Sequence, residues 1–116
     1  MKEYMLIYLG GDPEWKANTP QDEMMASMER WGQWMDKLQA KDQLVTGGSP
    51  LHYGGKRLDP NLLVTDIAAA EFKELVSGYS IVKAEDFDQA VAVAKECPIF
   101  EYPGISVEIR EVMQMG

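Results

Sequence analysis

The residue best suited to proton transfer is His52, the single histidine of the chain. Histidine is the residue type whose ordinary pKa lies near neutrality, so it can accept and release protons at physiological pH. His52 follows the pair Gly47-Gly48 and precedes a long excursion of the chain. We therefore treat it as a candidate acid–base catalyst, with a solvated loop histidine as the alternative.

Three further polar side chains are candidates for binding a small substrate: Tyr79, Lys73 and Arg110. The planar guanidinium of Arg110 suits a carboxylate if it faces a cavity, and a cross-strand pair with a glutamate is the alternative. Tyr79 either directs its hydroxyl into a cleft or packs in the core with a solvated tip. Lys73 lies among acidic neighbours, a pattern that also fits a solvated face with weak ion pairing.

Other kinds of site find little support in the sequence. There is no glycine-rich phosphate loop, nucleophile elbow or metal-ligand spacing, so neither a metal nor a cofactor is expected. Cys97 is the only cysteine, which excludes an intrachain disulfide and a cysteine-based zinc site, and we expect it to be a small buried packing residue. Trp31 and most methionines fall on a helical stripe and are assigned to the core rather than to a cofactor pocket.

Composition narrows the class of protein further. The 116 residues are 46% hydrophobic and carry a net charge of −8, without a basic stripe, so nucleic-acid binding is not expected. No apolar segment approaches the roughly 20 residues needed to span a bilayer, and no membrane role is expected. The chain starts without a recognisable leader peptide, so a cytoplasmic location is expected.

The first half of the chain predicts a strand, a helix and a second strand. The first strand spans Glu3 to Leu9. A helix is expected to follow, with Thr19 as its N-cap and Pro20 at its first position, and to end near Lys41. Its apolar stripe consists of Met24, Met28, Trp31, Met35 and Leu38.

Beyond this helix, Leu44 to Leu51 reads as the second strand, and its paired glycines suggest a bulge or a close backbone approach. Tyr53 to Asp66 carries turn residues and reads as an insert, with a small hairpin as one interpretation. Such a long connection is the first place to look for a site. Ile67 to Val76 is left open between helical turns and an irregular loop.

The second half repeats the pattern of strand, helix and strand. Tyr79 to Val82 is the third strand, and Ser106 to Met113 alternates as the fourth. Between them, Asp86 followed by Gln89 resembles a capping box that opens a helix, which Pro98 stops. The predicted apolar face of that helix consists of Phe87, Ala90, Val91 and Ala94.

These elements predict a single α+β domain over residues 1–116, with the ferredoxin-like order β-α-β-β-α-β and a four-stranded antiparallel sheet. Two helices can cover only one face of such a sheet, and the other face would remain exposed and apolar. The simplest cover is a second copy of the chain packed around a two-fold axis. We therefore expect a homodimer in which two sheets form a dimeric α+β barrel.

Several short motifs stand out along the chain: the first strand, the segment 62–74, the GY pair at 78–79, and the runs AKECP and SVEIR. Together they resemble the DGPF branch of the YCII-related family. The matching residues are Asp66, Ala70, Glu71, Lys73, Glu74, Gly78, Tyr79, Asp88, Ala90, Ala94, Cys97, Pro98, Ser106, Val107, Glu108 and Arg110. The resemblance covers nearly the whole chain and implies the same dimeric α+β barrel.

The resemblance also implies chemistry, although the chain departs from the motif that names the branch. Where relatives read Asp-Gly-Pro-Phe, this chain reads Asp66-Ile67-Ala68-Ala69, without the residues that fix a tight turn. In some YCII-related proteins a histidine and an aspartate are proposed to act as a pair, which here implies His52 with Asp66. Asp66 as a turn cap is the alternative. The expected function is isomerase- or lyase-like acid–base catalysis on a small organic molecule, and the alternative is a non-catalytic dimer that binds a small molecule or regulatory partner.

Overall fold

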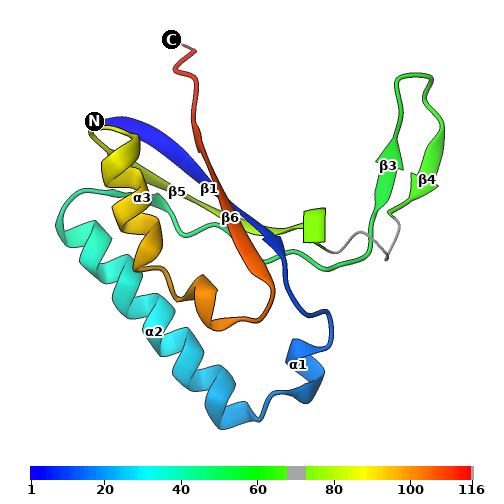
Figure 1. Cartoon of the computed structure of the whole chain (residues 1–116), viewed down its shortest axis with the longest axis horizontal. Coiled ribbons are helices and arrows are strands. Elements are labelled where there is room, and N and C mark those ends of the chain that lie inside the picture. Colours follow the sequence, from blue (N-terminus) through cyan, green and yellow to red (C-terminus); the bar gives the residue numbers. More distant parts are fainter. Residues whose placement is uncertain (68–72, 116) are drawn as a thin grey trace.

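A four-stranded antiparallel sheet forms the centre of the protein, which confirms the predicted ferredoxin-like α+β arrangement (Figure 1). The computed structural model describes residues 1–67 and 73–115. The strand order is β2-β5-β1-β6, so the two long strands β1 and β5 are neighbours. The strands are β1 (Lys2–Gly10), β2 (Leu44–Thr46), β5 (Val76–Ala84) and β6 (Ile105–Glu111).

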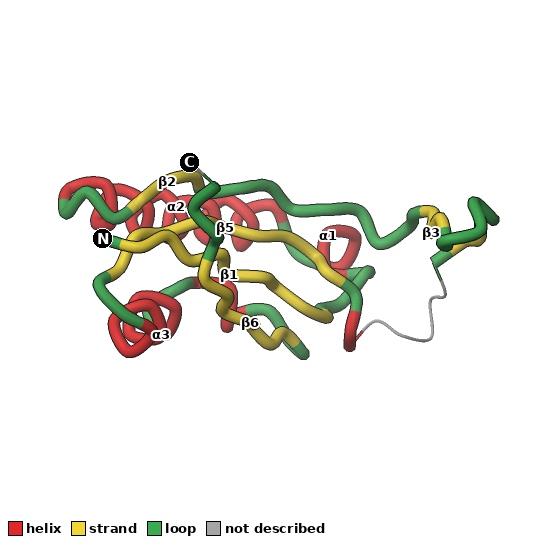
Figure 2. Tube along the Cα trace, turned by 90° about the horizontal axis from the view of Figure 1, so that it is seen from above, coloured by secondary structure: helices red, strands yellow, loops and turns green. Residues whose placement is uncertain are grey.

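The helices lie on one side of this sheet, as Figure 1 shows for α2 and α3. Seen from above in Figure 2, the four strands lie side by side, and α2 runs behind β2 and β5. The helices are α1 (Trp15–Asn18), α2 (Gln21–Ala40), α3 (Phe87–Lys95) and the 3-10 helix η2 (Pro98–Glu101). None of the helices in the described residues is long and apolar enough to cross a membrane.

The start of α2 differs from the prediction. Pro20, with extended backbone at φ −58° and ψ 149°, takes the N-cap position, and no side chain caps the helix. Thr19 is therefore not the N-cap, because it serves as the C-cap of α1, a short helix that the sequence analysis did not predict. Acidic residues in the first turn of α2 still stabilise the helix, because their negative charges lie at the positive end of the helix dipole.

The buried stripe of α2 lies slightly round the helix from the predicted one. The residues that face the sheet are Ser27, Trp31, Trp34 and Leu38, which follow each other at steps of four, three and four. Met28 was assigned to the core, and this was wrong, since 72% of it is exposed. It lies one residue beyond Ser27, and one residue turns a helix by about 100°, which carries its side chain away from the sheet.

The core between the sheet and the helices contains a short chain of hydrogen bonds between polar groups. The Tyr8 hydroxyl donates to Ser80 Oγ at 2.7 Å, and Ser80 donates to the carbonyl of Gly47 at 2.8 Å. Tyr8 also lies 3.7 Å from the sulfur of Cys97, whose predicted burial is confirmed. Burial raises the pKa of Tyr8 and raises the pKa of the Cys97 thiol to about 11.

The second strand is shorter than predicted: β2 ends at Thr46, and its register against β5 shifts between Leu44 and Thr46. Gly48 adopts φ +70°, and a Cβ there would overlap the carbonyl oxygen of Tyr79. Of the two predictions for the paired glycines, the close backbone approach is confirmed at Gly48, and the irregular register lies just before them, between Leu44 and Thr46. Beyond Thr46, the pairing of these two segments continues as a bridge between Pro50 and Gly78 and a hydrogen bond from the Leu51 N–H to the Ser77 carbonyl.

The predicted cap of α3 is confirmed, since Asp86 Oδ1 accepts from the backbone N–H of Gln89 at 2.9 Å. Its apolar face is only partly as predicted. Phe87 packs edge-on against Tyr4 at 4.9 Å but is 49% exposed, and Val91 is exposed as well. The residues of α3 that are buried are Ala90, Val93 and Ala94.

The insert forms the hairpin that was offered as one interpretation. Its strands are β3 (Lys56–Leu58) and β4 (Val64–Asp66), and Asp59 Oδ1 accepts from two backbone N–H groups of the turn. We call residues 56–66 the arm. It projects past the end of the sheet, on the side away from the helices (Figure 1). The radius of gyration is 15.6 Å, compared with about 13 Å for a compact domain of this length.

The second face of the sheet has no helix over it among the described residues (Figure 2). We call it the open face. Its apolar side chains are half-buried by their neighbours within the sheet. They are Met5, Ile7, Leu9, Tyr79 and Ile81. For the segment 67–76, the sequence did not decide between helical turns and an irregular loop. This segment lies partly outside the described residues, and its last residue begins β5.

Candidate functional site

A cavity of ≈ 480 Å³ lies at the base of the arm. One wall is apolar and includes Leu51, Ile67 and Val76, and the polar groups around it are His52, Arg57 and Glu74. These residues come from the segment after β2, from β3, from the residue just after β4, and from the start of β5 with the residues just before it. An apolar cavity with a few convergent polar groups is the usual form of a small-molecule site.

Backbone hydrogen bonds bring the three segments together. The N–H of Leu51 donates to the carbonyl of Ser77 at 2.9 Å, and the N–H of Ile67 donates to the carbonyl of Gly55 at 3.1 Å. These two bonds fasten the chain on either side of His52. Gly48, whose backbone passes close to the carbonyl of Tyr79, precedes them, so the segment leaves the sheet edge at a fixed place.

Tyr53 fastens the same segment to the far end of β1. Its hydroxyl donates to the carbonyl of Gly10 at 3.1 Å. Burial raises the pKa of Tyr53, and the negative charge of Asp12 raises it further. Because the neutral phenol is the form that donates, both effects favour this hydrogen bond.

His52 and Asp66 lie on the two sides of the arm's base, but their side chains are not joined. Asp66 forms an ion pair with Lys56, and both of these side chains are largely exposed. His52 is exposed and lines the cavity. Within residues 1–67 and 73–115, no hydrogen bond or ion pair connects the histidine to the aspartate.

The three predicted binding residues do not line this cavity. Tyr79 and Arg110 lie on the open face, opposite Ile7 and Met5 respectively on β1. In the part of the chain that the structure describes, Arg110 makes no ion pair, so the alternative of a cross-strand glutamate pair is not seen either. Lys73 is exposed and precedes Glu74, which does line the cavity.

Arg57 lines the cavity but was not predicted from the sequence as a site residue. Side chains alternate between the two faces of a strand, and this alternation would have distinguished Arg57 from its neighbours Lys56 and Leu58. In β3, Lys56 and Leu58 share one face of the arm and Arg57 takes the other. Because Arg57 lines the cavity, the Leu58 face of the arm points away from it.

This set of groups can bind and polarise a small organic molecule. Arg57 supplies donors for a carboxylate or carbonyl oxygen, and His52 and Glu74 supply groups that exchange protons. In the described residues, no three side chains of the kinds that ligate metals gather closely enough to hold an ion. Ala68 and Ala69, where the chain departs from the Asp-Gly-Pro-Phe pattern, lie outside the described residues.

Comparison with known proteins fits this fold. The model of the YCII-related domain matches residues 5–116, which is nearly the whole chain. No curated protein matches it. With the match extending from the first strand to the end of the chain, this protein belongs to the YCII-related family.

Proposed function

We propose that this protein is a homodimer of the DGPF branch and that it performs isomerase- or lyase-like acid–base catalysis on a small organic molecule. The observation that carries the proposal is the position of His52, which lines the ≈ 480 Å³ cavity together with Arg57 and Glu74. The DGPF assignment rests on the motifs around Asp66 and in the segments 78–79 and 106–110.

The lining of the cavity indicates the class of substrate. Leu51, Ile67 and Val76 suit a small apolar or cyclic body, and Arg57 suits a carboxylate or carbonyl group attached to it. With the oxygen held by Arg57, a neighbouring C–H bond is acidified because the developing negative charge is delocalised towards the guanidinium. His52 takes that proton and returns it to another position of the same molecule.

Two carboxylates are candidates to orient the imidazole of His52 and to stabilise its protonated form. Asp66 is the one that the family resemblance implies, and in the protomer it must exchange its ion pair with Lys56 for His52. Glu74 lines the same cavity as His52 and makes no ion pair with any described residue. We assign the role to Asp66, and the competing assignment to Glu74 is a separate outcome of the experiment below.

The dimer is supported by two uncovered apolar surfaces of the protomer. The open face carries a row of half-buried apolar side chains, and the arm carries Leu58, Leu62, Leu63 and Val64, each more than 60% exposed. Both lie on the side away from the helices (Figure 1). Tyr79 and Arg110, on the open face, would then contact a ligand only where the two protomers meet.

The test is proton exchange in D₂O with a panel of small cyclic and carbonyl compounds, read as loss of C–H signals by NMR. His52→Gln should abolish exchange, and Asp66→Asn should reduce it about 10²- to 10⁴-fold, the usual range for acid–base groups. Glu29→Gln, an exposed change on α2, is the control and should leave exchange intact. Full exchange in a folded His52→Gln variant would refute the catalytic role, and loss in Glu74→Gln with retention in Asp66→Asn would move the carboxylate role to Glu74.

A non-catalytic binding dimer is the second candidate, favoured by the exposure of His52 to solvent. A binding module does not need its histidine in a dry site. For this candidate, a compound that shifts the NMR signals of Arg57 and Val76 should bind equally well to His52→Gln and to the natural chain. No compound in the panel should then exchange protons faster with the protein than without it.

A further inference from the structure

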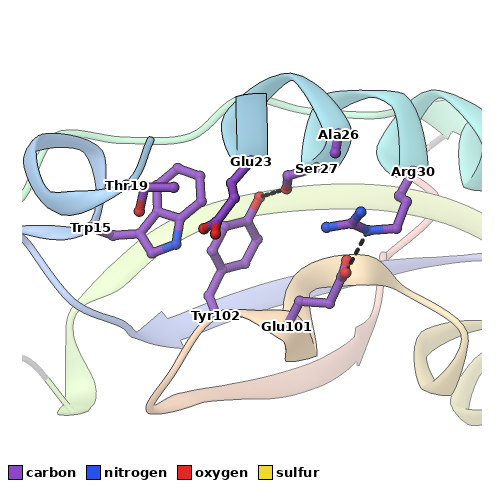
Figure 3. Close-up of a pocket in the computed structure, with 8 residues that line it drawn as sticks. All are labelled: Trp15, Thr19, Glu23, Ala26, Ser27, Arg30, Glu101 and Tyr102. Carbon is purple, nitrogen blue, oxygen red and sulfur yellow. Dashed lines mark hydrogen bonds and ion pairs between the residues drawn. The ribbon is translucent and has the colours of Figure 1, made fainter. Parts of the chain in front are cut away.

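A second cavity, of ≈ 200 Å³, lies on the helix side of the molecule, between the first half of α2 and the η2 segment (Figure 3). None of its lining residues belongs to the arm or to the cavity that contains His52. Its character is set by Trp15, Glu23, Arg30, Glu101 and Tyr102. No role was predicted for it from the sequence.

Two aromatic rings form one wall of this second cavity. Trp15 and Tyr102 meet edge to face, with ring centroids 4.8 Å apart and planes at 77°. The hydroxyl of Tyr102 accepts from Trp31 Nε1 at 3.0 Å and shares a 2.5 Å hydrogen bond with Ser27. Because the hydroxyl is held by α2, the ring of Tyr102 is fixed, and what it offers a ligand is its π surface.

The charges of the cavity leave one carboxylate uncompensated. Arg30 Nε lies 2.5 Å from Glu101 Oε1, so these two charges neutralise each other. Glu23 points from α2 towards Tyr102 and lies beside Trp15 in Figure 3. Among the described residues it has no ion-pair partner. The lining therefore carries a net negative charge, in a chain whose own net charge is −8.

We propose that this second cavity binds a small organic ammonium ion of about the size of choline. Aromatic faces attract cations through the negative charge of their π surfaces, and methylated ammonium groups suit such walls because they are large and weakly hydrated. Glu23 balances the charge of the ion, and the apolar wall accepts its methyl groups. An anion would be bound less strongly than a cation, because Arg30, which could attract it, is already paired with Glu101.

The positive end of α2 lies near the cavity and opposes a cation, but its effect is offset locally. Asp22 and Glu23 occupy the first turn of α2 and carry two full negative charges against about half a positive charge from the helix. The field at the cavity therefore keeps the negative sign that the proposal needs.

The experiment compares choline with its neutral carbon isostere, 3,3-dimethylbutan-1-ol, at constant ionic strength. Binding is followed by two-dimensional NMR on the indole N–H of Trp15 and the amide of Tyr102. Choline should saturate these shifts and bind at least about fivefold more tightly than the isostere, as expected for a cation over aromatic faces. Glu23→Gln and Trp15→Leu should each weaken choline about three- to tenfold, as read on the Tyr102 amide.

Glu29→Gln is the matched control, because it removes the same charge from the same helix outside the cavity. It should leave the affinity for choline unchanged. Equal binding of the neutral isostere, an equal loss in Glu23→Gln and Glu29→Gln, or no saturable shift up to about 50 mM choline would each overturn the proposal. The arm and His52 take no part, so either result leaves the proposed catalytic function untouched.

Discussion

The body of the protein and its arm use similar leucines in opposite ways. Leu6, in the middle of β1, is completely buried between the sheet and the helices, whereas Leu62, in the turn of the arm, is 75% exposed. The body closes its own core on the helix side with aromatic and aliphatic side chains. The arm has two strands of three residues each, and these pair with each other.

This contrast indicates which parts of the fold are complete in one chain. A two-stranded hairpin is at best marginally stable by itself in water. Exposed leucines do not stabilise it until another surface covers them. The arm keeps its shape through backbone pairing and the turn at Asp59, while its apolar side chains are left over. Contact with a second protein surface would stabilise such an exposed apolar surface. The open face of the sheet is apolar and uncovered too, so the same holds for it.

The largest expected difference between the two regions is in stability. Leu6→Ala should lower the free energy of unfolding by about 3 to 4 kcal/mol, because it leaves a cavity in a closed core. Leu62→Ala should change the stability of the protomer by less than about 0.5 kcal/mol. Urea unfolding at equal protein concentrations measures both, and equal losses would contradict the division into body and arm.

The junction between the two regions depends on Gly48. Gly48→Ala should cost about 2 to 3 kcal/mol, because its backbone is left-handed at φ +70° and the new methyl group would overlap the Tyr79 carbonyl. Gly54→Ala is the control, since a Cβ there meets no atom within 4 Å. Thermal unfolding compares the two, and an unaltered melting temperature for Gly48→Ala would show that the close approach of Gly48 to the Tyr79 carbonyl is not fixed as described.

The buried thiol of the body predicts a dependence on alkaline pH. Burial raises the pKa of Cys97 from its ordinary 9.0 to about 11. Above pH 9 the unfolded chain loses this proton first, so stability should fall by about 2 kcal/mol between pH 9 and pH 11. Burial raises the pKa of Tyr8 as well, which adds to the loss above pH 10.

Cys97→Ala separates these contributions. It should remove the part of the loss that starts near pH 9 and leave the part due to Tyr8. Urea unfolding at steps of pH measures this, and an identical pH profile in the natural chain and the variant would show that the thiol does not carry the effect.

The smallest effect on the fold and the largest on association should come from the arm. Leu62→Ala combined with Leu63→Ala should leave circular dichroism unchanged and weaken the dimer about tenfold or more, because both side chains lose apolar contact area. Met25→Ala is the control, since Met25 is 63% exposed on α2, on the helix side. Concentration-dependent gel filtration detects the change, and equal behaviour of arm variant and control would exclude the arm from the interface.

Much of the fold follows from local sequence signals. The cap at Asp86, the alternation of β6 and the turn chemistry of the arm each depend on neighbouring residues, and all three predictions are confirmed. The rotation of α2 was predicted less well, because Met28 and Trp34 both suit a core by residue type. Which one is buried depends on how the helix lies on the sheet, and that is a tertiary property.

The candidate site was only partly predictable for the same reason. His52 was found because histidine is chemically distinctive, and it does line a cavity. Its neighbours Arg57 and Glu74 come from separate segments that meet through backbone bonds between residues far apart in sequence. The second cavity depends on α1, a four-residue helix too short to show a periodic pattern.

Sedimentation equilibrium of the full chain at micromolar concentration is the most direct test of the idea that the arm and the open face are halves of an interface. The chain mass is 13.0 kDa. We expect a particle of twice that mass, which the Leu62→Ala and Leu63→Ala changes convert towards the mass of one chain. A single-chain mass for the unaltered protein across the micromolar range, with the arm and open face left in water, would contradict the account.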